Sequence, residues 1–221
     1  MRNNNSSRFG KFVRIFFSPS GAIAGANIDW YLLEKSRVTQ RAAGERNFHV
    51  FYQLLKGAKE AGFADRLLLT EGPEKFDILN KTRLEIDGVD DLAEWRLLKE
   101  ALDVVGFSEE EQFELFRIIA IILHIGNIGL SATNADQALM PPESQPVVEK
   151  VCHLLGISDK EFMKSVLAPK VRAGREWVTY PRSKKQAEDE LGALSKFMFE
   201  RTFGGMVSRI NKALDRPNAK S

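Results

Sequence analysis

Asn3-Asn4-Asn5-Ser6-Ser7-Arg8-Phe9-Gly10-Lys11 sets three amides, two hydroxyls and a guanidinium directly before an apolar run over residues 12–17, which predicts a strand. A polar loop that enters a buried strand is where α/β proteins commonly place ligand contacts. A serine hydroxyl is a hard ligand for Mg²⁺, and an arginine fork binds carboxylate or phosphate. The residue types therefore suit a magnesium–nucleotide complex. On composition alone, the alternative is a capped, polar N-terminal arm.

Length and composition predict a globular chain with a substantial core. The chain has 221 residues, of which 43% are hydrophobic and 15 are phenylalanine, and its formal net charge is +2. This near-balanced charge gives no reason to expect nucleic acid as a partner. The single cysteine, Cys152, excludes an internal disulfide and fits a reducing cytosol, so we expect a cytoplasmic protein.

The sequence gives no sign of a metal cluster or a membrane anchor. His49, His124 and His153 are scattered without the spacing of a metal site, so we interpret them as structural. There is no secretory signal, and the most apolar run, residues 118–125, is far shorter than the roughly 20 residues of a membrane span. We expect no membrane span.

Periodicity predicts a mainly α fold with a small β part. After the first strand we expect a turn and a second strand over residues 23–33, a hairpin that needs a larger sheet to be stable. Helices are predicted over residues 45–55, from Asp90 or Asp91 to about Gly106, over 109–124 with a Ser108–Glu111 capping box, over 146–155, and from Ser158 to before Pro169. Residues 133–142 are predicted to form a surface loop. The helix over 109–124 should be central and buried.

A basic segment with an aromatic residue follows at residues 169–181. Strand-forming Val171, Trp177 and Val178 flank Gly174, which predicts a hairpin, and we interpret it first as a solvated surface loop. A long helix is predicted over residues 183–214.

Several strings resemble the myosin motor domain. Asn3 to Lys11 resembles the switch I loop of myosins, N-x-N-S-S-R-F-G-K, whereas kinesins continue differently after Ser-Ser-Arg. Tyr-Leu-Leu-Glu-Lys-Ser-Arg-Val at 31–38, Glu-Arg-Asn-Phe-His at 45–49 and Arg-Ile-Asn-Lys-Ala-Leu at 209–214 are similar to myosin sequences in the same order. Within the family, the sequence is most similar to conventional class II-like myosins, fungal ones among them.

The resemblance implies a helical bundle, the upper 50-kilodalton subdomain, carrying two strands of the central sheet of P-loop NTPases. It divides the chain into switch I (1–11), two sheet strands (12–34), a helical subdomain (45–168), an actin-binding hairpin (169–181) and a long helix (183–214). The switch I loop would bind ATP and Mg²⁺: Asn3, Ser6 and Ser7 as nucleotide contacts, Ser7 as the Mg²⁺ ligand, and Ser6 with Arg8 in catalysis.

The hairpin resembles the cardiomyopathy loop of myosins, which contacts actin. The resemblance implies that actin filaments contact Lys170, Arg172, Arg175 and Glu176. The acidic surface of actin would attract the basic side chains among them.

The chain also departs from a whole motor. It contains no G-x-x-x-x-G-K-[ST] phosphate loop and no D-x-x-G-F-E switch II, so we expect Arg8 to have no partner glutamate in this chain. We expect the isolated chain to be inactive and to need the remainder of the motor domain as a partner, in a cytoskeletal setting. The alternatives are a non-catalytic helical actin-interaction module derived from a motor, and another P-loop NTPase with a similar switch.

Overall fold

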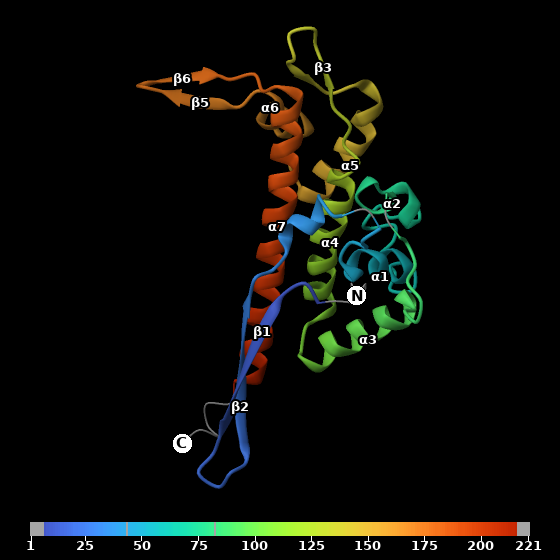
Figure 1. Ribbon diagram of the computed structural model, residues 1–221, viewed down its shortest axis with the longest axis vertical. Helices are drawn as coiled ribbons and strands as arrows, with labels where there is room; N and C mark the ends of the chain where they lie inside the picture. Colours follow the sequence, from blue (N-terminus) through green and yellow to red (C-terminus); the bar gives the residue numbers. More distant parts are fainter. Residues whose placement is uncertain (1–6, 43, 82, 216–221) are drawn as a thin grey trace.

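The computed structural model describes residues 7–42, 44–81 and 83–215. Figure 1 shows an elongated molecule in which the long helix α7 (Lys184–Leu214) runs beside a group of shorter helices. The hairpin of β1 (Gly10–Phe17) and β2 (Ile23–Tyr31) lies near one end, and the hairpin of β5 (Lys170–Ala173) and β6 (Glu176–Thr179) lies near the other. The predicted mainly α fold with a small β part is confirmed.

The first hairpin pairs β1 (Gly10–Phe17) with β2 (Ile23–Tyr31) in antiparallel register, with Gly10 opposite Tyr31 and a bulge between Phe16 and Phe17. The first strand begins before the predicted residue 12, and the second ends before the predicted residue 33. Strand β2 ends early because Leu32 adopts a left-handed φ of 54°, which a strand cannot contain.

The two strands of this hairpin have different surroundings. On β1, Phe12 and Phe17 remain 59% and 60% exposed. On β2, the main chain of Ile28 is held by the Asn211 amide of α7, which accepts from its N–H at 2.7 Å and donates to its carbonyl at 2.9 Å. The hairpin therefore rests on α7 and leaves apolar side chains of β1 uncovered, as expected of strands that belong to a larger sheet.

The core gathers around α4 (Glu109–Ile125). Its predicted capping box is present: Ser108 Oγ accepts from the Glu111 N–H, and the Glu111 carboxylate accepts from the Ser108 N–H. Every residue from Ile119 to Ile125 is buried, which confirms that this helix is central. It packs on α1 (His49–Gly57), α5 (Gln145–Leu155) and α7.

The helix predicted over residues 45–55 is displaced. Phe48 is extended, with φ −56° and ψ 136°, and α1 begins only at His49. Asn47 explains the delay, because its side-chain amide donates to the carbonyls of Val38 at 3.2 Å and Ile78 at 3.1 Å, two segments distant in sequence. Residues 45–48 therefore form a buried connection instead of a first helical turn.

The predicted surface loop over residues 133–142 is only partly a loop. Ala138 pairs with Ala132 and is 8% exposed, because a short strand pair folds this segment back onto the protein. This pair and the remaining helical elements have the following bounds: β3 (Ser131–Ala132), β4 (Ala138–Leu139), η1 (Lys35–Val38), η2 (Pro73–Lys75), α2 (Asp77–Asn80), α3 (Asp91–Val104), η3 (Pro142–Ser144) and α6 (Asp159–Leu167). Caps form at Asp90 and Ser158, as their residue types predict.

Candidate functional site

The Ser7–Arg8 corner lies immediately before β1. Ser7 is exposed, and Arg8 has a left-handed φ of 62°, which is costly for a residue other than glycine. Two contacts hold this conformation: the Arg8 carbonyl accepts from the Glu34 N–H at 3.0 Å, and the neighbouring Phe9 ring meets the Phe203 ring edge-on at 4.9 Å. Two further predicted site residues, Asn3 and Ser6, lie outside the described residues.

The Arg8 side chain has a carboxylate partner in this chain. Its Nη1 lies 3.7 Å from Oε2 of Glu34, and the two side chains are 25% and 42% exposed. The expectation that Arg8 finds no glutamate here is therefore wrong. The physical reason is that the main-chain bond between residues 8 and 34 brings the segment after β2 alongside the corner.

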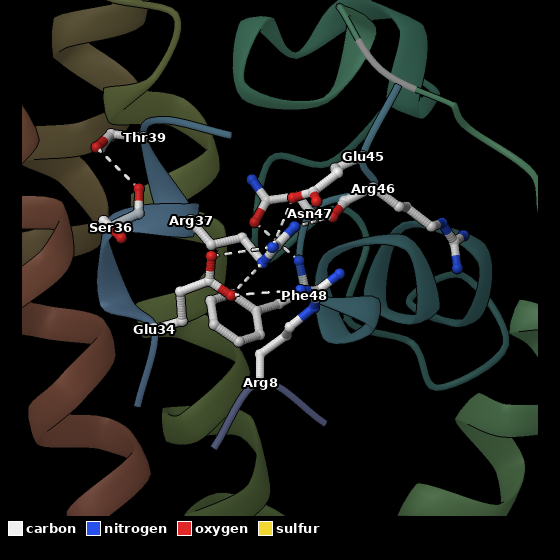
Figure 2. Close-up of polar contacts among 9 residues, drawn as sticks. All are labelled: Arg8, Glu34, Ser36, Arg37, Thr39, Glu45, Arg46, Asn47 and Phe48. Carbon is white, nitrogen blue, oxygen red and sulfur yellow. Dashed lines mark hydrogen bonds and ion pairs between the residues drawn. The ribbon is translucent and has the colours of Figure 1, made fainter. Parts of the chain in front are cut away.

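Arg37 is the centre of the polar network shown in Figure 2. Its side chain is 2% exposed, and its guanidinium donates to both carboxylate oxygens of Glu34 at 3.0 Å, to Glu45 at 2.7 Å and to the Arg46 carbonyl at 2.9 Å. A buried guanidinium is tolerated only when its donors are satisfied in this way. The network ties the segment after β2 to the segment before α1.

A second buried charge cluster lies next to this network. Arg46 pairs with Asp91 at the start of α3, donates to the Leu84 carbonyl at 3.0 Å and lies 3.7 Å above the Tyr52 ring. Its Nη1 also lies 3.0 Å from Nδ1 of His49. Burial first, and the positive charge of Arg46 second, lower the pKa of His49, so the imidazole is held neutral.

A hollow of about 350 Å³ opens beside the corner. Ser7, Arg8, Arg37 and Arg46 are among its lining residues, and most of its wall is apolar, from Phe48, Val50, Leu98, Leu102, Leu115, Phe116, Ile119, Phe199, Phe203 and Met206. The corner therefore has solvent on one side and an apolar recess on the other.

The second predicted site is the hairpin of β5 (Lys170–Ala173) and β6 (Glu176–Thr179), which turns at Gly174 with φ 63°. All its strand residues are exposed, including Trp177 at 67%. Arg172 pairs with Trp177 and Lys170 with Thr179, so these four share one face. Glu176 pairs with Ala173 on the opposite face, and Arg175 lies in the turn.

Within residues 7–42, 44–81 and 83–215, no three His, Cys, Asp or Glu side chains gather in a way that could hold a metal ion. In the same ranges, no helix is long and apolar enough to cross a membrane. Cys152 is buried, and burial raises the pKa of its thiol to about 11. His124 is also buried, with Nε2 3.1 Å from the Leu67 carbonyl, in keeping with a structural role.

A family model described as the myosin head (motor domain) matches residues 1–221. The chain belongs to the myosin head family. It is similar to Myosin type-2 heavy chain 1 of Schizosaccharomyces pombe, with 46% identity over 222 residues that cover 100% of this chain and 14% of that protein. Myosin type-2 heavy chain 2 of the same organism is 45% identical over 214 residues, covering 97% of this chain and 10% of that protein.

Myosin-1 of Saccharomyces cerevisiae is 41% identical over 220 residues, covering 99% of this chain and 11% of that protein. The predicted resemblance to fungal class II myosins is thus confirmed. This myosin head segment spans between 10% and 14% of the length of these three relatives.

Sequence reasoning missed the charged network of this myosin segment. In the sequence, Glu34 and Arg37 stand out only as part of a string similar to myosins, although their i,i+3 spacing permits an ion pair. No local signal in the sequence predicts the other two partners, Glu45 and the Arg46 carbonyl, because only the fold brings them to Arg37.

Proposed function

We propose that residues 1–221 supply the switch I loop and part of the actin-binding face of a class II-like myosin, a cytoskeletal motor driven by ATP. The membership in the myosin head family supports this proposal. The observation that carries it is the Ser7–Arg8 corner, where an exposed hydroxyl and a guanidinium follow one another at the head of a strand with uncovered apolar side chains.

In this proposal Ser7 is the protein ligand of Mg²⁺, and Asn3 and Ser6 contact the phosphates. The donor set fits the group, because Mg²⁺ with a nucleotide takes one or two protein oxygens and fills its remaining positions with phosphate and water. When bound, Mg²⁺ neutralises charge that develops on the transferred phosphoryl group. The chain's own contribution is to orient: the left-handed corner presents Ser7 to solvent while the Arg8 main chain stays bonded to residue 34.

The remainder of the motor domain is the proposed partner of β1, whose residues 11–17 are all exposed. Phe12, Ile15 and Phe17 are at least half exposed, and burying them against the rest of the motor would remove this apolar surface from water. The phosphate loop and switch II would come from that remainder. We therefore expect the isolated 221-residue chain to show no ATP turnover above background.

The hairpin β5–β6 is the proposed actin contact. Lys170, Arg172 and Trp177 share one exposed face, and Arg175 at the turn adds a further positive charge. A face of this kind attracts an acidic filament surface and pairs an aromatic anchor with basic groups. Glu176 points from the other face and would meet a different part of the filament.

The test is actin-activated ATP turnover and co-sedimentation with actin by a heavy chain that contains this segment. Lys170→Glu with Arg172→Glu should weaken pelleting and actin activation, and raising the salt concentration should weaken wild-type pelleting too. Lys56→Glu with Lys59→Glu is the matched control, since it makes the same charge change on exposed lysines of α1 and the following turn. If both double variants pelleted equally with actin, the hairpin would not be the actin contact.

A second candidate is a non-catalytic actin-interaction module. The separation of the two sites favours considering it, because Figure 1 shows the hairpin β5–β6 projecting at the top of the molecule and the start of β1 near its middle. Under this alternative, the heavy chain would pellet with actin through the hairpin but show no ATP turnover. Turnover that is lost in Ser7→Ala and Arg8→Ala would exclude it.

A further inference from the structure

We propose that Glu34 is a holding partner for Arg8, competing with the carboxylate that Arg8 must reach when the nucleotide site closes. This inference rests on the proposed function, which leaves switch II, with the glutamate expected to pair with Arg8, to the remainder of the motor domain. It adds Glu34 as a positioning residue, with Arg37 and Glu45 fixing where Glu34 lies.

The geometry of the two arginines on Glu34 is unequal. Figure 2 shows Glu34 beside Arg37 with Arg8 approaching the same carboxylate. Arg37 binds both oxygens at hydrogen-bond distance, 3.0 Å each, whereas Arg8 comes no closer than 3.7 Å in its ion pair. A contact of 3.7 Å is an attraction between charges without a hydrogen bond. Arg8 is therefore the weakly held partner and Arg37 the tightly held one.

Release of Arg8 leaves no unpaired charge behind. Arg37 is 2% exposed and stays anchored by Glu45 and the Arg46 carbonyl, so it keeps the Glu34 carboxylate paired whether or not Arg8 is present. An ion pair between partly exposed groups contributes little, and its loss is correspondingly cheap. These features are those of a reversible holding site.

The main chain and the side chain of Arg8 are held separately. The bond from the Glu34 N–H to the Arg8 carbonyl, at 3.0 Å, does not involve the guanidinium. The side chain can thus leave Glu34 while the corner keeps its left-handed conformation. Glu34 and the other carboxylate compete for Arg8, so removing one of them increases the fraction of molecules in which Arg8 pairs with the other.

The first test is made without nucleotide, on a heavy chain that contains this segment. Phenylglyoxal modifies free guanidinium groups, so the rate at which it labels Arg8, measured by mass spectrometry, reports how often the Arg8 side chain is free. Glu34→Gln should raise this rate about two- to five-fold, the range that partly exposed ion pairs contribute. Glu200→Gln is the matched control, because it removes a carboxylate that pairs with Lys35 at 2.7 Å and does not contact Arg8. An unchanged labelling rate in Glu34→Gln would overturn the inference.

The second test is a double-mutant cycle on the ATP cleavage step in single-turnover experiments. Glu34→Gln should speed cleavage about two- to five-fold at low salt, and less at high salt. In an Arg8→Gln background, the same substitution should change nothing, because Glu34 acts through Arg8. An equal effect in both backgrounds would show that Glu34 acts through the packing around Arg37 and would overturn the inference.

A second substitution at position 34 tests whether the effects of Glu34→Gln come from misfolding instead of from the lost ion pair with Arg8. Glu34→Asp keeps a carboxylate beside Arg37 and shortens its reach toward Arg8, so it should act in the same direction with a smaller effect. Failure of the proposed function looks different from failure of this inference: in the first case the wild-type heavy chain shows no Mg-ATP turnover, and in the second it turns over normally and is indifferent to Glu34.

Discussion

Replacing Arg37 by methionine should be among the most destabilising changes in the chain. The substitution keeps an unbranched side chain but removes the buried guanidinium that binds Glu34, Glu45 and the Arg46 carbonyl. Breaking a buried ion pair by deleting one partner costs roughly 3–5 kcal/mol. Glu34, at 42% exposed, can rehydrate, whereas Glu45, at 16%, does so less easily, so we expect about 3 kcal/mol, the low end of that range.

Urea unfolding followed by circular dichroism measures this loss. With a slope of about 2 kcal/mol per molar urea, the midpoint should fall by about 1.5 M. Arg83→Met is the matched control: Arg83 and Asp87 are 50% and 98% exposed and 3.6 Å apart, so its loss should cost less than about 1 kcal/mol. Similar midpoints for Arg37→Met and Arg83→Met would refute the view that Arg37 is a structural centre.

Three further predictions follow from buried groups. Gly57→Ala should lower the free energy of unfolding by about 1–3 kcal/mol, measured by urea unfolding, because its Cβ would lie 2.1 Å from the Trp95 ring. Burial and Arg46 lower the pKa of His49 in the folded chain. The stability that neutral His49 contributes is therefore complete above about pH 6.5 and is lost as the pH falls toward the folded pKa. His49→Gln should make the free energy of unfolding depend less on pH in this range, as measured by unfolding curves at several pH values. Cys152, with its pKa raised to about 11, should react with a thiol reagent at pH 8 more than about 100-fold more slowly in the folded chain than in urea, and equal rates would contradict its burial.

Local signals predicted much of the helical fold. Ser108 followed by Glu111 predicts the start of α4, and the apolar run after Ile118 predicts its burial. Both signals are local, because capping and hydrophobic patterning act within a few residues. Strand β1 is likewise readable from its apolar run, and Gly174 marks the turn of the second hairpin.

Long-range polar contacts account for what could not be predicted. Asn47 displaces the start of α1 because its side-chain amide donates to the carbonyls of Val38 and Ile78. The residues around Asn47 give no signal that predicts those partners. Arg8 is similar: its type indicates a carboxylate partner, but only the fold brings Glu34 to it. Sequence therefore identifies the groups of the candidate site, whereas the structure determines which of them meet.

The central claim is that the Ser7–Arg8 corner contacts a magnesium nucleotide. The most direct test is a Mg²⁺ titration of ATP turnover by a heavy chain containing this segment, comparing wild type with Ser7→Ala. If Ser7 is a Mg²⁺ ligand, the variant should lose most of its turnover or need at least about ten-fold more Mg²⁺ for half-maximal turnover, within the range seen when groups around a bound metal are altered. Wild-type turnover and an unchanged Mg²⁺ requirement in Ser7→Ala would contradict it.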